Sequence, residues 1–371
     1  MLNDLLKHYQ KKLPFVAFKV PNANKLKSYR QEDDHIYHPE TYTENGFVFA
    51  PFSETDTLKT ILFPSARCKI ETLELSALDI TSAASKPISA ESLPKSYSSL
   101  IETALDIISI GALKKVVLSK PFIFNAENLQ PLSIFEKMLL TYPSAFVYCW
   151  YHPKVGTWIG ATPETLLNIQ GNKLSTMSLA GTQKYDGETN ITWQEKELDE
   201  QDIVTQYIIE KLVDSGINID SIISAEIDTI RAGNLWHLQT KIEAVLELHK
   251  FNLKNLLSNL HPTPAICGKP KDLALDFINT HEDYNREYYT GFLGEMNAIK
   301  VRERNKRVSN VENTAYKNVT KSTQLFVNLR CMQLKDEEAI IYVGGGITKD
   351  SDPEKEWQEL LAKLQTVKSV L

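Results

Sequence analysis

The chain has 371 residues, of which 42% are hydrophobic, and a formal net charge of −6 at pH 7. This length and composition indicate a globular protein with one large or two ordinary domains. The acidic balance argues against general binding to nucleic acid, and no apolar run approaches the length of a membrane span.

The cysteines and the N-terminal segment indicate a reduced compartment. Cys68, Cys149, Cys267 and Cys331 are scattered and lack the CxxC spacing of zinc and redox sites. Such isolated cysteines are expected to be reduced thiols. The segment 1–15 is amphipathic but lacks a signal-peptide core and cleavage site. We therefore expect a cytoplasmic protein without a disulfide framework.

The N-terminal part of the chain alternates short apolar runs with polar loops. Phe15–Val20, Gly46–Pro51 and Thr60–Phe63 are typical of strands, and the Ser-, Ala- and Pro-rich segment Ser82–Ser96 is typical of a linker. Apolar residues at helical spacing then predict a helix that ends at Gly111.

The remainder of the chain is rich in strands, which come in runs and hairpins. The predicted strands are Lys114–Phe124, Ala145–His152, Thr157–Ala161, Leu166–Gln170, Lys173–Leu179, Ile223–Arg231, Leu235–Leu246, Tyr289–Asn297, Thr323–Leu334 and Ile340–Val343. The predicted helices are Ile134–Leu140, Trp193–Val213, Leu253–Leu260, Lys271–Asn279 and a last one after Asp352. Because helices stand between groups of strands and do not alternate with them, we expect an α+β fold with large antiparallel sheets covered by helices.

One helix in the middle of the chain carries two acidic side chains on its buried face. Val204, Ile208 and Leu212 recur at helical spacing and predict a stripe that faces a core. Glu197 and Glu200 extend this stripe into the first turns. Acidic residues near a helix start are common, because they complement the partial positive charge there.

A second helix near the C-terminus repeats the arrangement. Asp352 and Pro353 are typical of an N-cap followed by proline at the first helical position. Glu356 and Glu359 follow, in line with Leu360. Two inward acidic pairs repel each other in a dry site, and a hard divalent cation with oxygen ligands removes that repulsion. The sequence therefore predicts a Mg²⁺ site.

Two further residues could carry chemistry, although each also has a structural interpretation. Lys115 precedes a buried run and is either an edge charge or a desolvated amine that acts as general base. Glu164 follows Thr162-Pro163 and is either an edge carboxylate or a general acid held protonated by apolar surroundings.

Four other segments have two interpretations each. Gly344–Gly346 is either a flexible turn or a nest of backbone N–H groups that approaches an anion, and Arg330 could bind a carboxylate with two hydrogen bonds. The Pro-rich loop His261–Gly268 is either stiff for structural reasons or the wall of a small pocket. The basic segment Lys300–Lys321 is expected to be a solvated connection, not a nucleic-acid site.

Taken together, these residues resemble the chorismate-utilising enzymes, and within that family the isochorismate synthases. The matching motifs are KVVLSK (Lys115–Lys120), ATPETLL (Ala161–Leu167), SLAGT (Ser178–Thr182), EKELDEQDIV (Glu195–Val204), LWHL (Leu235–Leu238), HPTPAICG (His261–Gly268), EDYNREYYTGFLG (Glu282–Gly294), VNLRCMQL (Val327–Leu334) and YVGGGI (Tyr342–Ile347). Each motif alone is weak, but their number and order make the resemblance specific. Residues 1–90 contain no matching motif.

The resemblance implies one α+β domain over 1–371, with its site between two sheets stacked face to face and its motifs in 91–371. It implies that Lys115 activates water for attack at C2 of chorismate and that Glu164 protonates the departing C4 hydroxyl. Glu200 and Glu359 would bind Mg²⁺ directly, with Glu197 and Glu356 in support. The implied substrate-binding residues are Gly181, Thr182, His237, Ala265, Tyr289, Arg330, Gly344 and Gly346.

The favoured activity is the Mg²⁺-dependent conversion of chorismate to isochorismate, without an obligatory protein partner. The aminating relatives tend to have threonine at the position of Ala265, which favours the isochorismate synthases. The chain also departs from the family pattern, since Lys120, Gln201 and Thr290 stand where arginine, histidine and glycine are usual.

Two alternatives stay open at the level of sequence. A salicylate-forming or aminating relative would use the same site, although an aminating enzyme normally needs a glutaminase and no such domain is fused here. A non-catalytic protein that binds small anions or a metal is the more distant alternative. It needs no acid–base pair, so the presence of both Lys115 and Glu164 disfavours it.

Overall fold

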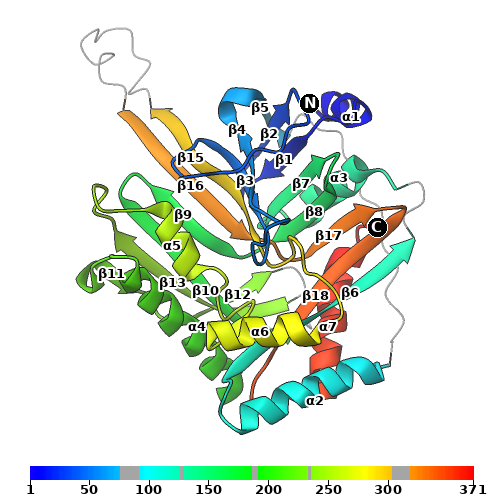
Figure 1. The fold of residues 1–371 in the computed structure, drawn as a ribbon, viewed down its shortest axis with the longest axis vertical. Helices are drawn as coiled ribbons and strands as arrows, with labels where there is room; N and C mark the ends of the chain where they lie inside the picture. The colour runs from blue at the N-terminus through cyan, green and yellow to red at the C-terminus, as the bar shows by residue number, and fades with distance from the viewer. Residues whose placement is uncertain (76–91, 126–128, 186–190, 233–234, 303–317) are drawn as a thin grey trace.

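The computed structural model describes residues 1–371 except 76–91, 126–128, 186–190, 233–234 and 303–317. In this part of the chain, two large antiparallel sheets are covered by helices, which confirms the predicted α+β class (Figure 1). None of the described helices is both long and apolar enough to cross a membrane.

The first sheet, sheet A, combines strands from both ends of the chain. Its spatial order is β14 (Gly268–Lys269), β6 (Lys115–Asn125), β18 (Glu338–Ile347), β17 (Cys331–Lys335), β8 (Gly156–Thr162), β7 (Phe146–His152), β1 (Phe15–Lys19), β2 (Lys25–Gln31) and β5 (Cys68–Glu74). The helices that pack on it are α1 (Leu2–Gln10), α2 (Lys95–Ser109), α3 (Pro131–Thr141), α6 (Lys271–His281) and α7 (Pro353–Lys368).

The second sheet, sheet B, is assembled in the same interleaved way. Its order is β11 (Ile222–Ser224), β13 (Leu235–Val245), β10 (Lys173–Lys184), β9 (Thr165–Gln170), β16 (Asn318–Val327), β15 (Phe292–Arg302), β3 (Gly46–Ala50) and β4 (Ile61–Pro64), and β12 (Asp228–Ala232) also pairs with β13. Helix α4 (Glu195–Asp214) packs on β10 and β13, and α5 (Leu253–Leu260) packs on α4. Short 3₁₀ turns occupy Ser65–Arg67 and Ile219–Ser221.

An aromatic layer holds the two sheets face to face. Phe49 of sheet B stacks on Tyr288 with ring centroids 4.4 Å apart, and Phe63 stacks on Trp150 of sheet A at 5.5 Å. Trp150 and Trp158 are fully buried in this layer. Because aromatic side chains bury large apolar areas, this layer accounts for the stacking of the sheets.

The alternation of side chains along β6 aims Lys115 at the space between the layers. Val116 and Leu118 belong to the core beneath the helices, so Lys115 and Val117 face the other way. Strand β6 is paired on both sides, by β14 and β18, and Lys115 is fully buried. The interpretation of Lys115 as an exposed edge charge is therefore wrong.

The single strand predicted over Thr323–Leu334 is wrong, because the structure has two strands in different sheets. Strand β16 ends at Val327 in sheet B, and β17 begins at Cys331 in sheet A. Between them Arg330 has a left-handed backbone with φ +49°, which turns the chain sharply. The crossing from one sheet to the other thus places Arg330 between them.

Other boundaries also differ from prediction. Strand β15 begins at Phe292, so Tyr289 lies in the turn before it, and the predicted strand Ile223–Arg231 is divided into β11 and β12. The short helix α1 and the strands β2 and β5 were not predicted. Both strands mix charged and apolar residues near the edge of sheet A, where charged side chains are tolerated.

Two predictions fall largely on residues that the structure does not describe. Most of the predicted linker Ser82–Ser96 lies outside the described residues, and α2 already begins at Lys95. Most of the basic segment Lys300–Lys321 also lies outside them. A single domain over 1–371 stays a prediction, although strands from the first 75 residues are paired in both sheets.

Candidate active site

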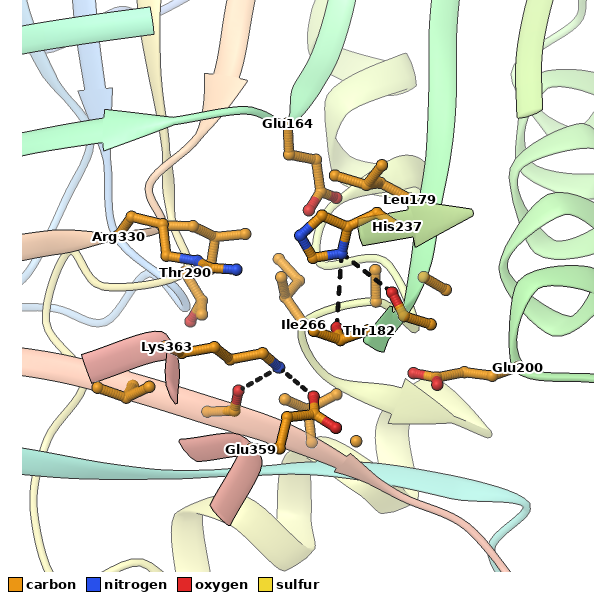
Figure 2. A pocket seen from close by; sticks show the side chains of 18 of the residues that line it. Glu164, Leu179, Thr182, Glu200, His237, Ile266, Thr290, Arg330, Glu359 and Lys363 are labelled. Atoms are coloured by element: carbon orange, nitrogen blue, oxygen red, sulfur yellow. Dashed lines mark hydrogen bonds and ion pairs between the residues drawn. The ribbon is translucent and has the colours of Figure 1, made fainter. Parts of the chain in front are cut away.

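One pocket between the two sheets brings together nearly all of the predicted site residues. It encloses about 940 Å³ of space not filled by atoms, part of it open to solvent. The predicted residues that line it are Glu164, Gly181, Thr182, Glu197, Glu200, His237, Ala265, Tyr289, Arg330, Gly344, Gly346, Glu356 and Glu359. Figure 2 shows the carboxyl groups of Glu164, Glu200 and Glu359 and the Arg330 guanidinium pointing into this space from different sides.

Lys115, the remaining predicted residue, is not among the residues that line the pocket, but it contacts Glu200, which is. Its Nζ lies 2.7 Å from Glu200 Oε1, and the two side chains are 1% and 16% exposed. A Cβ on Gly346 would lie 2.8 Å from Glu200 Oε1 and 2.9 Å from Lys115 Cε. The ion pair therefore occupies space that any side chain at position 346 would need.

Glu164 lies between β8 and β9 with its side chain buried in the pocket wall. Its backbone N–H donates to Thr162 Oγ1 at 3.2 Å. Burial raises the pKa of Glu164 to about 7, although the positive charges of Lys115 and Arg330 act in the opposite direction. Glu164 can therefore hold a proton near neutral pH, as a general acid must.

The tautomer of His237 follows from its contacts. Its Nδ1 lies 3.0 Å from the Gly181 carbonyl oxygen and 3.5 Å from Thr182 Oγ1. A carbonyl oxygen only accepts, so Nδ1 carries the hydrogen and Nε2 is an acceptor. Burial, assisted by the positive charge of Arg330, lowers the pKa of His237 to about 3. Nε2 has no partner among the described residues, which leaves a neutral acceptor for a hydroxyl group or water.

The glycines of β18 do not form a nest. Gly344–Gly346 lie within β18, pair with β6 in extended conformation, and none of the three has a left-handed backbone. The interpretations as a nest and as a flexible turn are therefore both wrong. The Gly344 carbonyl accepts from Lys363 Nζ at 3.0 Å and so points away from β6. Because the N–H and C=O of a strand residue point to the same edge, the N–H groups of Gly344 and Gly346 face the pocket as well.

Lysines neutralise the acids that were predicted to bind metal. Lys196 Nζ lies 2.7 Å from Glu356 Oε1, and Lys363 Nζ lies 2.6 Å from Glu359 Oε1. Glu197 Oε2 accepts from the backbone N–H at the N-cap of α4 at 2.9 Å, so this acid also stabilises the helix start. Each acid thus already has a partner in the protein.

The predicted convergence of four carboxylates on one ion is not seen. Within the described residues, no three or more His, Cys, Asp or Glu side chains are grouped so that they could hold a metal ion. The ion pairs with lysine explain why the carboxylates do not converge. Glu200, Glu356 and Glu359 are each held by a different ammonium group.

The donor chemistry nevertheless fits a hard cation. Burial and the negative charge of Glu359 raise the pKa of Glu356. Burial alone would also raise the pKa of Glu359, but the Lys363 ammonium holds it below its usual value. The repulsion that remains between two carboxylates is what a divalent cation with oxygen ligands relieves. Mg²⁺ fits these residues if Lys196 and Lys363 turn aside.

Several pocket residues were not predicted from the sequence. Lys196 directly precedes Glu197, and Lys363 follows Glu359 by four residues, the spacing at which helical side chains meet. That spacing was the available signal. Thr290, which departs from the family pattern, also lines the pocket. Ala265 and Ile266 line it as well, which confirms the interpretation of the Pro-rich loop as a pocket wall.

Comparison with known proteins agrees with this geometry. The family model of chorismate binding enzymes matches residues 65–369. The isochorismate synthase DhbC of Bacillus subtilis is 24% identical over 290 residues, which cover 74% of this chain and 67% of that protein. Component 1 of the anthranilate synthase of Saccharolobus solfataricus is 26% identical over 297 residues, which cover 76% of this chain and 63% of that protein. The matches thus span about two thirds of the length of these relatives.

A solved structure shares the fold. MenF, the menaquinone-specific isochorismate synthase from Escherichia coli, superimposes with a TM-score of 0.74 at 20% identity. The superposition covers 96% of this chain and 88% of that one. Since the family model covers most of the sequence and contains the residues that line the pocket, this chain belongs to the family of chorismate binding enzymes.

Proposed function

We propose that this protein is an isochorismate synthase, which converts chorismate to isochorismate. The observation that carries the proposal is that one pocket brings together Glu164, whose pKa is raised to about 7, Arg330, and Glu200 with its ion-paired Lys115. Isochorismate synthases are among the relatives that match this chain. A binding protein would have no use for an acid–base pair in this position.

The substrate carries two carboxylates, and the pocket has groups suited to each. Arg330, the Tyr289 hydroxyl and the Gly346 N–H would hold the carboxylate of the enolpyruvyl group. The ring carboxylate would lie toward Glu200 and Glu359. Gly181, Thr182 and His237 would line the ring, and Ala265 would shape the space near C2. A dianionic substrate is thus oriented from its two ends.

The chain's residues can then perform the isomerisation as a balanced exchange of one water for another. Lys115, as the neutral amine, takes a proton from water as the water oxygen bonds to C2. The ring double bond shifts, and the C4–oxygen bond breaks. Glu164 gives its proton to the departing hydroxyl, which leaves as water. A proton from Lys115 must return to Glu164 before the next turnover.

The proposal includes a magnesium ion. Glu200 and Glu359 would hold it, supported by Glu356 and Glu197, because carboxylate oxygens are the ligands that Mg²⁺ prefers. When bound, it would supply positive charge for the ring carboxylate. We also propose that the enzyme needs no protein partner and is cytoplasmic. Its four cysteines are free thiols, which is compatible with a reducing compartment.

The test is turnover of chorismate by purified protein with Mg²⁺, first in ¹⁸O-labelled water and then with excess ammonium salt. Isochorismate should form with one labelled oxygen at C2, and the reaction should stop at an equilibrium of the two isomers. Ammonium should not change the product, and pyruvate should not accumulate.

Each other outcome rejects the proposal in favour of a named alternative. An aminated product would assign the chain to the anthranilate or aminodeoxychorismate branch. Stoichiometric pyruvate with salicylate would assign it to the salicylate branch. Folded protein with Mg²⁺ and no reaction would favour a binding protein.

A further inference from the structure

Two turns on one side of the pocket carry the residues proposed to hold a substrate carboxylate. Thr290, next to Tyr289, has φ +61°, and Arg330 has φ +49°. A left-handed backbone is uncommon outside glycine and a clear outlier for a β-branched residue such as threonine. Such conformations persist only where the surrounding structure holds them. Figure 2 shows Thr290 and Arg330 on the same side of the pocket.

A single buried residue, Asn328, holds the two turns together. Its backbone N–H donates to the Gly291 carbonyl at 2.8 Å, and its carbonyl accepts from the Thr290 N–H at 2.9 Å. Its side-chain Nδ2 donates to the Tyr288 carbonyl at 2.8 Å, and Oδ1 accepts from the Tyr148 hydroxyl. Asn328 is fully buried. Its bonds therefore span the turn before β15 and the turn before β17.

The orientation of the amide is determined by its partners. The Tyr288 carbonyl can only accept, so the nitrogen of Asn328 must face it. Aspartate has the same shape but would place a carboxylate oxygen against that carbonyl in a dry site. A buried polar group left without its partner is costly. Asparagine thus suits position 328 better than its isostere.

The same turn also contacts the strand end that carries the proposed acid. The Ala161 N–H donates to the Arg330 carbonyl at 3.1 Å, and the Val327 N–H donates to the Glu164 carbonyl at 3.0 Å. On the other turn, the Tyr289 ring stacks on Tyr342 with centroids 5.3 Å apart. The backbone around Asn328 is therefore hydrogen-bonded both to the segment that carries Glu164 and to the turn that carries Tyr289.

We propose that Asn328 is a positioning residue that fixes the Arg330 guanidinium relative to the Tyr289 hydroxyl. By tying Tyr288–Gly291 to its own turn, it determines where the substrate carboxylate binds. A guanidinium binds a carboxylate through two hydrogen bonds of fixed geometry, so a small displacement of the Arg330 guanidinium weakens substrate binding. The inference rests on the proposed function, since it takes chorismate as the ligand of Arg330 and Tyr289.

The test compares Asn328→Ala, Asn328→Asp and Tyr148→Phe with the wild type. Asn328→Ala should raise KM for chorismate about tenfold, the size of one weakened charged hydrogen bond. Its kcat should change little, because Lys115 and Glu164 stay in place. Asn328→Asp should raise KM at least as much. Tyr148→Phe keeps the bonds from Asn328 to the other turn and should leave KM near the wild-type value.

A double-mutant cycle with Arg330→Ala separates positioning from general stability. If Asn328 acts through Arg330, adding Asn328→Ala to Arg330→Ala should raise KM no further. A KM unchanged in Asn328→Ala, or an equal increase in both backgrounds, would overturn the proposal. If Asn328→Ala does not fold, it is combined with Thr290→Gly, which removes the left-handed penalty, and compared with Thr290→Gly alone by the same criteria.

The experiments distinguish a failure of the proposed role of Asn328 from a failure of the proposed function. Absence of chorismate turnover in the wild type would reject the function itself. Wild-type turnover together with an unchanged KM in Asn328→Ala would reject only the role of Asn328.

Discussion

Lys115 Nζ lies 2.7 Å from Glu200 Oε1, so the proposed base and a proposed metal ligand form one buried ion pair. Glu200 therefore determines where the amine points when the pocket contains no cation. A cation held by Glu200 would compete with the ammonium for the same carboxylate. Variants of either residue are thus expected to affect both metal binding and proton transfer.

Lys115→Ala should lose at least ~10²-fold in kcat, the usual contribution of a proton-transfer group. Binding of chorismate should survive, because Lys115 is not among the residues proposed to hold the carboxylates. Steady-state kinetics and calorimetric titration with chorismate check these two expectations. Turnover near the wild-type rate would remove Lys115 from the mechanism.

Glu164→Gln should lose turnover by a similar factor, since the amide has no proton to give at neutral pH. With the pKa of Glu164 raised to about 7 by burial, kcat/KM of the wild type should fall as pH rises above that value. The residual activity of the variant should lack this decline. A pH–rate profile of both proteins measures it, and an unchanged profile in Glu164→Gln would contradict the assignment.

The same pKa shift predicts a change in stability. The folded protein holds the Glu164 proton more tightly than the unfolded chain, whose ordinary pKa is 4.5. The stabilisation is complete below pH 4.5 and is lost as pH rises through about 7. At pH 8 the buried charge costs on the order of 3 kcal/mol. Glu164→Gln should therefore unfold at higher denaturant concentration than the wild type at pH 8, and at a similar one near pH 4.

Removal of divalent cations should abolish activity, and added Mg²⁺ should restore it. Glu200→Ala and Glu359→Ala should lose activity that Mg²⁺ does not restore, because each removes a proposed ligand. Glu195→Ala is the matched control, since Glu195 is exposed in the first turn of the same helix as Glu200. Full turnover in a thoroughly chelated sample would reject the metal site.

Gly346→Ala should reduce turnover between about 10- and 100-fold with little change in melting temperature. Its Cβ would meet the ends of the Lys115 and Glu200 side chains, which can move, but only away from their functional positions. Gly345→Ala is the control, because its Cβ would have ordinary contacts with Glu356 Oε2 at 3.6 Å and Leu360 Cδ1 at 3.8 Å. Equal activity of the two variants would show that the space beside Lys115 is not needed.

The inward direction of the acidic helix faces was predictable because helical periodicity is local. The stripe of Val204, Ile208 and Leu212 is buried as predicted, and the N-cap at Asp352 accepts from the Lys355 N–H. For Lys115 the sequence left an edge charge and a buried amine open, and the pairing of β6 on both sides decides between them. For the residues of these helices, the spacing in the sequence is enough to predict the direction in which each side chain points.

The turn at Arg330 and the lysine partner of Glu356 were not predictable in this way. Residues 323–334 contain no glycine or proline to signal a break, and Asn328, two residues before the left-handed Arg330, is hydrogen-bonded to a distant segment. The pair of Lys196 with Glu356 joins α4 to α7 across 160 residues. Such contacts arise only when the two sheets are assembled.

The interleaving of the strands has a consequence for the synthesis of the protein. Strand β3 pairs with β15, with Gly46 opposite Met296, and β6 pairs with β18 from Val116 to Asn125. A ribosome adds about 5–20 residues per second, so β3 waits many seconds with one edge unpaired. Contacts so distant along the chain also slow folding. The pocket can close only after α7 emerges, and a nascent chain halted before β15 would lack strands of both sheets and expose their unpaired edges to aggregation.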